Sequence, residues 1–396
     1  MSLTDTPNAN RLHITLFGRR NSGKSSLINA LTGQDTALVS NTPGTTTDLV
    51  SKAMEIQGIG PCLFIDTPGF DDEGALGELR ISRTLKAIEK TDIALLLCED
   101  TTFSHEKEIL ALLKEKNIPV IPVLNKIDIR ENSDHLATYI EEQCKIHPLL
   151  ISAKEKIGIE LIRQAILEKL PSDFGQQSIT RELVTENDLV LLVMPQDIQA
   201  PKGRLILPQV QTIRELLDKK CLVVTCTTDK FSVTLQALAR PPKLIITDSQ
   251  VFKAIYEQKP KESELTSFSV LFAGYKGDIH YYVESAAVIE RLTESSRVLI
   301  AEACTHAPLS EDIGRVKLPR LLRKWIGENL QIDMVAGTDF PQDLTPYSLV
   351  IHCGACMFNR KYVLSRIERA REQHIPMTNY GVAIAFLNGI LDQIKY

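Results

Sequence analysis

Short apolar runs alternate with amphipathic stretches as far as residue 170 of this chain. The apolar runs have the length of buried strands, and the stretches between them carry apolar residues at helical spacing. Strands that alternate with helices form a mostly parallel sheet covered on both faces. The pattern therefore predicts an α/β fold. The expected strands are 12–17, 62–65, 93–98, 120–124 and 149–151, and the expected helices are 24–31, 79–89, 107–116 and 159–170.

The same alternation resumes after a breaker-rich segment at 171–175. A polar, charged stretch at 258–264, which contains Pro260, suggests a second boundary. We therefore expect three domains, at 1–172, 173–262 and 263–396. The expected strands of the second and third domains are 189–194, 222–225, 244–247, 298–300 and 349–351, and the expected helices are 210–217 and 318–326.

The composition agrees with several domains and limits the classes of function. A chain of 396 residues is too long for one ordinary core, and 43% hydrophobic with 24% charged residues is typical of a soluble protein. No apolar run approaches the ~20 residues of a membrane span, and the polar start of the chain has no signal-peptide core. We expect a cytoplasmic protein without a membrane partner. The net charge of −5 makes a nucleic-acid partner a poor expectation.

The strongest motif lies between the first expected strand and the first expected helix. Residues 18–25 fit the phosphate-binding pattern GxxxxGKS/T. Glycines let the backbone N–H groups and the helix N-terminus surround phosphate oxygens. Lys24 is expected to reach the β- and γ-phosphates, and Ser25 to bind Mg²⁺. The other loop residues expected at the nucleotide are Asn21, Ser22, Gly23 and Ser26.

Three further motifs follow later strands and complete a nucleotide site. Asp66 is expected to hold a Mg²⁺ water, and the Gly69 N–H to contact the γ-phosphate. Asp128, within the sequence Asn125-Lys126-Ile127-Asp128, can accept both N1–H and the 2-amino group of guanine, which selects GTP and GDP over adenine nucleotides. The residues expected to close over the base are Ser152, Ala153 and Lys154. The sequence thus predicts a P-loop GTPase domain with a mostly parallel sheet, followed by two smaller α/β domains.

The order and spacing of these motifs resemble the translation-factor class of GTPases, and residues 43–48 look like the first switch of its TrmE/Era-like branch. The resemblance implies that Thr46 senses Mg²⁺, with Thr45 close enough to keep open, and that Asn21 helps to bind K⁺. Phe70 stands where a Ras-like enzyme carries its water-orienting glutamine, so slow hydrolysis is expected. The residues expected to act in catalysis are Lys24, Thr46 and Gly69.

A second group of chemically active residues lies near the end of the chain. Cys304 and His306 follow one expected strand, and His352, Cys353 and Cys356 follow another. If these strands are neighbours, both groups emerge at the same end of the sheet, where open α/β sheets collect their ligands. The chain has 8 cysteines, and in a reducing compartment metal ligation or packing is a better explanation than disulfides. The cysteines expected to be packed are Cys62, Cys98, Cys144, Cys221 and Cys226.

Three interpretations of this group remain open on residue types alone. The thiols and imidazoles can be packing residues, a Cys₃His zinc site, or the ligands of an iron–sulfur cluster. The whole chain favours the cluster. Three thiolates leave one iron of a [4Fe–4S] cluster for histidine, water or an exchangeable ligand.

The combination of both sites resembles the [FeFe]-hydrogenase maturation GTPases (HydF) over essentially the whole chain. The family motif maps to Cys304, His306, His352, Cys353 and Cys356. The resemblance implies a [4Fe–4S] cluster on the three cysteines and a middle domain that forms a homodimer by sheet association. It also implies a scaffold that carries a diiron subcluster precursor, with two radical-SAM maturases and the apo-hydrogenase as partners.

Two other functions compete with this interpretation. One is a TrmE/Era-like RNA-modification or ribosome-assembly GTPase with a Cys/His zinc module, which the acidic charge balance disfavours. The other is a general iron–sulfur carrier with a GTPase timer.

Overall fold

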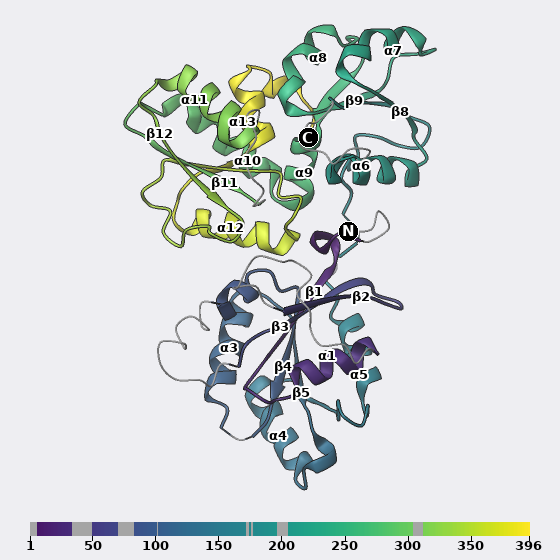
Figure 1. Cartoon of the computed structure of the whole chain (residues 1–396), viewed down its shortest axis with the longest axis vertical. Coiled ribbons are helices and arrows are strands. Elements are labelled where there is room, and N and C mark those ends of the chain that lie inside the picture. The colour runs from purple at the N-terminus through teal and green to yellow at the C-terminus, as the bar shows by residue number, and fades with distance from the viewer. Residues whose placement is uncertain are drawn as a thin grey trace. The chain divides into compact units, whose positions relative to one another are not determined.

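A computed structural model of the chain describes residues 6–33, 50–69, 83–100, 102–171, 174–175, 177–195, 205–303 and 312–396. The chain divides into two compact units, Met1–Gln176 and Gln177–Tyr396 (Figure 1). Each unit is an α/β structure with sheets that are parallel almost throughout, so the expected fold class is confirmed. None of the described helices is long and apolar enough to cross a membrane.

The first unit contains a six-stranded sheet with the order β2-β3-β1-β4-β5-β6. Only β2 runs antiparallel to its neighbour. Its central strands are buried along their whole length because helices cover both faces. Its strands are β1 (Leu12–Gly18), β2 (Val50–Ile56), β3 (Gly60–Asp66), β4 (Ile93–Cys98), β5 (Val120–Leu124) and β6 (Leu149–Leu150).

Two apolar cores lie on opposite faces of this sheet. Leu12, Ile14 and Leu16 of β1 pack with apolar residues of α1 and α5, while Phe17 belongs to the core formed with α3 and α4. This alternation along one strand follows from the period of two in a β-strand. The helices of this unit are α1 (Lys24–Thr32), α3 (Ser104–Glu115), α4 (Ser133–Cys144) and α5 (Ile159–Glu168).

The second unit begins with a four-stranded parallel sheet of order β10-β9-β7-β8. The boundary predicted at residue 262 stays a prediction, although β10, which follows it, pairs with β9. The strands are β7 (Leu189–Val193), β8 (Leu222–Cys226), β9 (Leu244–Thr247) and β10 (Glu264–Ser267), and the helices are α6 (Leu207–Asp218), α7 (Phe231–Ala237), α8 (Phe252–Gln258) and α9 (Phe268–Lys276).

A second four-stranded parallel sheet, of order β12-β11-β13-β14, completes this unit. Helix α12 packs on one of its faces, whereas α11 packs on the other (Figure 1). One apolar core joins the two four-stranded sheets, which explains why they form a single unit. The strands are β11 (Arg297–Glu302), β12 (Gln331–Ala336), β13 (Leu349–His352) and β14 (Met377–Asn379), and the helices are α10 (Ile279–Ala286), α11 (Leu318–Ile326), α12 (Arg360–Glu372) and α13 (Tyr380–Leu387).

Candidate functional site

The phosphate-binding loop connects β1 to α1, as the sequence predicts. Gly23 ends the loop with a φ of 90°, and a Cβ there would lie 2.2 Å from Asn125 Nδ2, so only glycine fits. The buried Lys24 ammonium group donates to the carbonyl oxygens of Gly18 (2.8 Å) and Arg19 (2.6 Å). The loop therefore curves around a cation at the N-terminus of α1, an arrangement suited to phosphate oxygens.

The expected Mg²⁺ ligands meet at the end of β3. The Ser25 hydroxyl donates to Asp66 Oδ2 at 2.6 Å. The other carboxylate oxygen, Asp66 Oδ1, is buried and has no hydrogen-bond partner among the described residues. Burial raises the pKa of Asp66, while Ser25 and Lys24 oppose this shift. A hydroxyl beside a carboxylate with an unused oxygen fits Mg²⁺, which prefers oxygen ligands and retains several waters.

The guanine-recognition residues are fixed by contacts among the motifs themselves. Asn125 donates from Nδ2 to the Ser22 carbonyl and accepts the Ala153 N–H at Oδ1, both at 3.0 Å. The Ser152 hydroxyl donates to Asp128 Oδ1 at 2.6 Å, and this bond lowers the pKa of Asp128. Asp128 is exposed and therefore presents an ionised carboxylate to solvent. This geometry suits the two adjacent N–H donors of guanine.

Carboxylates that the sequence did not single out pair with two cations of the motifs, Arg19 and Lys126. Arg19 pairs with Glu106 of α3 (Nε–Oε1, 2.9 Å) and with Asp100 (Nη1–Oδ2, 3.2 Å). Lys126 in turn pairs with Glu99 at 3.0 Å. Glu99, Asp100 and Glu106 belong to none of the motifs and lie far in sequence from the loop at 18–25, so the sequence did not indicate these pairs.

The remaining expected nucleotide residues are only partly within the described chain. Asn21 is exposed with a φ of 63°, and Lys154 is exposed beside Glu155. Ser26 lies on the exposed side of α1, and Gly69 follows β3. Thr45, Thr46 and Phe70 lie outside the described residues. Their roles, and the K⁺ role of Asn21, stay predictions.

The strands that precede the two cysteine groups are neighbours, as predicted. In the parallel pairing of β11 with β13, Ala301 lies opposite His352. The expected helix 318–326 is α11, which lies between these strands in sequence. Cys304 and His306 lie outside the described residues. The described chain before them ends at Ala303, which directly follows the last residue of β11.

Backbone N–H groups surround the sulfur of Cys353. Ala303 donates to Cys353 Sγ at 3.0 Å, and Ala355 donates to it at 3.4 Å. Ala355 has a φ of 52° and its carbonyl accepts the Phe358 N–H at 3.0 Å, so the Cys353-x-x-Cys356 segment ends in a tight turn. The Cys353 carbonyl also accepts the Asn379 amide at 3.2 Å. The sulfur is thus held next to the residue that precedes Cys304.

The donor set fits a metal or cluster bound by thiolates. Burial raises the pKa of the Cys353 thiol to about 12, Cys356 also raises it, and the two N–H groups and Arg366 oppose the shift. A coordinated metal deprotonates a thiol outright, and N–H···S bonds to ligand sulfur stabilise the charge and tune cluster potentials. Within the described part of the chain no three His, Cys, Asp or Glu residues form a metal-binding group. The proposed third cysteine, Cys304, lies outside that part.

His352 is buried and uses both ring nitrogens. Nε2 lies 2.9 Å from Arg366 Nη1, and Nδ1 lies 2.8 Å from the Cys353 carbonyl oxygen. A guanidinium group can only donate, so Nε2 accepts and the proton resides on Nδ1. Burial and the adjacent Arg366 lower the pKa of His352 to about 3, so the ring is neutral. Metal ligation by His352 would require one of these bonds to break, and this role stays a prediction.

The other five cysteines are packing residues, as expected. Cys62, Cys98, Cys144 and Cys221 are buried, while Cys226 is half-buried at the end of β8. Burial raises the pKa of Cys62 to about 12 and that of Cys144 to about 11. These thiols are therefore protonated at neutral pH.

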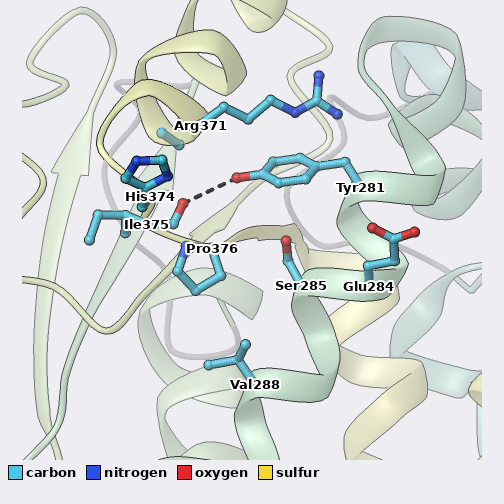
Figure 2. Close-up of a pocket in the computed structure, with 9 residues that line it drawn as sticks. Tyr281, Glu284, Ser285, Val288, Arg371, His374, Ile375 and Pro376 are labelled. Carbon is cyan, nitrogen blue, oxygen red and sulfur yellow. Dashed lines mark hydrogen bonds between the residues drawn. The ribbon is translucent and has the colours of Figure 1, made fainter.

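A cavity of about 490 Å³ opens between α10 and the end of α12 (Figure 2). The Tyr281 hydroxyl donates to the Ile375 carbonyl across it at 3.1 Å. Arg371 lies 4.3 Å from the centre of the Tyr281 ring and pairs with Asp278 at 2.6 Å. No cysteine is among the described residues that line the cavity. It belongs to neither candidate site.

Three protein-family models match successive parts of the chain. The "Hydrogen maturase F dimerization domain" model matches residues 179–277, and the "Hydrogen maturase F tetramerization domain" model matches residues 280–395. Together these two models cover more than half of the chain. The "50S ribosome-binding GTPase" model matches residues 13–126.

Curated tRNA modification GTPases are similar to the GTPase part of this chain. The tRNA modification GTPase MnmE of Dechloromonas aromatica is 40% identical over 161 residues, which are 39% of this chain and 34% of that protein. MnmE of Nitrosomonas europaea is 38% identical over 160 residues, 40% of this chain and 34% of that protein. The chain thus spans about a third of the length of these relatives.

Solved GTPase structures resemble part of the chain. Era of Aquifex aeolicus bound to GDP and AlF₄⁻ has 22% identity and a TM-score of 0.35, and covers 54% of this chain and 92% of its own. The G domain of the FeoB iron transporter of T. maritima has 25% identity and a TM-score of 0.32, and covers 40% and 98%.

Proposed function

Because this chain belongs to the hydrogen maturase F family, we propose that it is a slow GTPase that carries a [4Fe–4S] cluster and serves [FeFe]-hydrogenase maturation as scaffold and carrier. In this role it assembles the diiron subcluster from its precursor and delivers it to the apo-hydrogenase. Radical-SAM maturases supply the chemistry of the diiron ligands.

The observation that carries the cluster assignment is the surrounding of Cys353. Two N–H groups point at its sulfur, and one of them belongs to Ala303, the residue before Cys304. A packed structural thiol needs no such donors. Three thiolates from Cys304, Cys353 and Cys356 would hold the cluster and leave one iron available for the precursor.

The nucleotide steps follow from the residues of the first unit. Lys24 binds the β- and γ-phosphates, and Asp128 accepts the donors of guanine. Ser25 and, through a water, Asp66 would hold Mg²⁺, which would neutralise charge on the phosphates. Thr46 and the Gly69 N–H sense the γ-phosphate. Phe70 cannot orient water by hydrogen bonding, so hydrolysis is slow and the protein works as a switch.

Self-association is supported by the matched dimerization and tetramerization domains. For the dimer we propose sheet extension at β8, which is an edge strand of its sheet. The first residue of β8, Leu222, is 51% exposed. An exposed apolar side chain on an edge strand suits a surface that a second copy of the chain would cover. The partners proposed beyond the dimer are the apo-hydrogenase and the radical-SAM maturases, all in the cytoplasm.

Metal analysis of anaerobically purified and reconstituted protein tests the proposal. We expect iron and sulfide in a ratio near that of a [4Fe–4S] cluster, a brown colour, and an EPR signal after reduction with dithionite. Stoichiometric zinc without iron would contradict the assignment and favour the rival RNA-directed GTPase. In that case, bound RNA would be measured next, since the MnmE-like region of the chain is only its GTPase part.

A further inference from the structure

Arg366 is a buried cation without a described carboxylate partner. It lies on α12, is 1% exposed, and is among the largest fully buried side chains of the described chain. Its hydrogen-bond partners are all uncharged. They are His352 Nε2 (2.9 Å), the Gly337 carbonyl (2.6 Å) and the Tyr362 hydroxyl (3.2 Å). Within the described part of the chain, Arg366 Nε has no hydrogen-bond partner.

Aromatic rings compensate part of this charge. The guanidinium carbon lies 4.6 Å from the ring centres of Phe340 and Phe358 and 4.7 Å from that of Tyr362. Cation–π contacts of this kind are favourable in a desolvated site. They do not replace an anion, since a buried ion without a counter-charge is strongly destabilising. The site therefore has an excess of positive charge.

Two hydrogen bonds connect the positively charged Arg366 to the candidate metal centre. Arg366 donates to His352, and His352 donates from Nδ1 to the carbonyl of Cys353. Two consecutive hydrogen bonds, from Arg366 to His352 and from His352 to Cys353, therefore connect α12 to the Cys353-x-x-Cys356 turn. A thiolate-bound iron–sulfur cluster at that turn is negatively charged, and its one-electron reduction adds a further negative charge.

We propose that Arg366 is the counter-charge of the cluster and acts through His352 to raise its reduction potential. Arg366 is thus a positioning and electrostatic residue rather than a ligand. The inference rests on the proposed function because it requires a cluster at Cys353. It also gives His352 a defined task, which is to transmit the contact from Arg366 to the cysteine turn.

Charge removal in the full-length reconstituted protein tests this role. Arg366→Met removes the cation and retains an apolar stem. Arg369→Met is the matched control, since Arg369 lies on the same helix, 5.7 Å from the Phe340 ring, and donates to the Pro341 carbonyl at 3.4 Å. The readouts are iron per chain and the midpoint potential from a dithionite titration followed by EPR.

We expect Arg366→Met to retain iron but to shift the reduction equilibrium toward the oxidised cluster by about tenfold, or about 59 mV for one electron. Arg369→Met should match the unmodified protein. Arg366→Lys, which retains the charge, should restore most of the potential. Unchanged potential in Arg366→Met would overturn the inference, as would an equal shift in Arg366→Lys, which would indicate packing rather than charge.

A second variant decides the question if Arg366→Met does not fold by circular dichroism. His352→Leu leaves the cation and its aromatic rings but removes the link to Cys353. Full iron content, an unchanged EPR line shape and a lower potential would support the inference. Native potential, loss of iron or a changed line shape would overturn it, the last two because they would make His352 a ligand. Failure of the unmodified protein to bind iron would instead contradict the proposed function.

Discussion

The nucleotide site and the candidate metal centre differ in whether the residues that support the site belong to sequence motifs. In the nucleotide site, most contacts run between motifs: Asn125 holds Ser22 and Ala153, Ser25 holds Asp66, and Ser152 holds Asp128. At the metal centre, the groups that hold Cys353 are backbone N–H groups, Asn379 and the His352–Arg366 pair. The difference teaches that a motif can identify ligands without revealing the charges that control them.

The largest expected effect concerns the metal centre. Cys353→Ser should abolish stable [4Fe–4S] assembly, because the loss of one of three thiolates leaves two irons without a cysteine. Iron and sulfide per chain after anaerobic reconstitution measure this. Cys226→Ser, a half-buried cysteine at the end of β8, is the matched control and should retain iron. Equal iron in both variants would show that Cys353 is not a ligand.

The nucleotide site should respond next most strongly. Lys24→Ala removes the buried ammonium group at the N-terminus of α1 and should reduce turnover by roughly 10²–10³, the usual cost of losing a group that stabilises transition-state charge. Phosphate release under saturating GTP measures it, with the exposed Lys107→Ala as control. The iron content of Lys24→Ala should equal that of the unmodified protein, which would show that this substitution affects the nucleotide site alone. Turnover retained in Lys24→Ala would refute the phosphate role.

Guanine selectivity depends on one exposed carboxylate. Asp128→Asn replaces an ionised acceptor with an amide, and charged hydrogen bonds contribute about 1.5–3 kcal/mol each. We expect the GTP dissociation constant to rise about 10–150-fold, with discrimination against xanthosine triphosphate lost, because the amide can donate to the xanthine 2-oxo group. Competition binding with both nucleotides measures this. Preserved preference for GTP would contradict the assignment of Asp128.

The smallest effect concerns the alkali cation. Because Asn21 is expected to help bind K⁺ near the β- and γ-phosphates, hydrolysis should be several-fold faster in K⁺ than in Na⁺ at equal ionic strength. Asn21→Ala should remove the difference. Equal rates in both salts would end the K⁺ hypothesis while leaving GTP binding intact.

The sequence predicted the fold where strands are uniformly apolar and missed it where they are not. β1, β4 and β5 are buried on both faces, so their apolar runs are continuous. β2 is an antiparallel edge strand of mixed polar and apolar residues, most of them only half-buried. Helix α4 buries only Ala137, Ile140 and Cys144 and therefore has a weak apolar stripe. The sequence pattern does not reveal elements of this kind, because much of their surface faces water and they carry few apolar residues.

The site residues also differ in how readily the sequence reveals them. Glycine, lysine and carboxylate motifs are recognisable because phosphate and guanine impose a fixed local geometry. Arg366 could not be recognised, since an arginine in a charged helix normally faces solvent. It is buried only because β12, β13 and α12 bring Gly337, His352 and Tyr362 together around it. A group assembled from three elements leaves no local signature.

Activation of apo-[FeFe]-hydrogenase tests the central claim most directly. The full chain, produced together with the radical-SAM maturases, would be purified anaerobically and mixed with the apo-enzyme, and hydrogen evolution would be measured. We predict activation by the unmodified protein, none by Cys353→Ser, and unchanged activity of other iron–sulfur enzymes in cells that lack this chain. Failure of the iron-loaded protein to activate, or a general loss of iron–sulfur enzymes in those cells, would contradict the account.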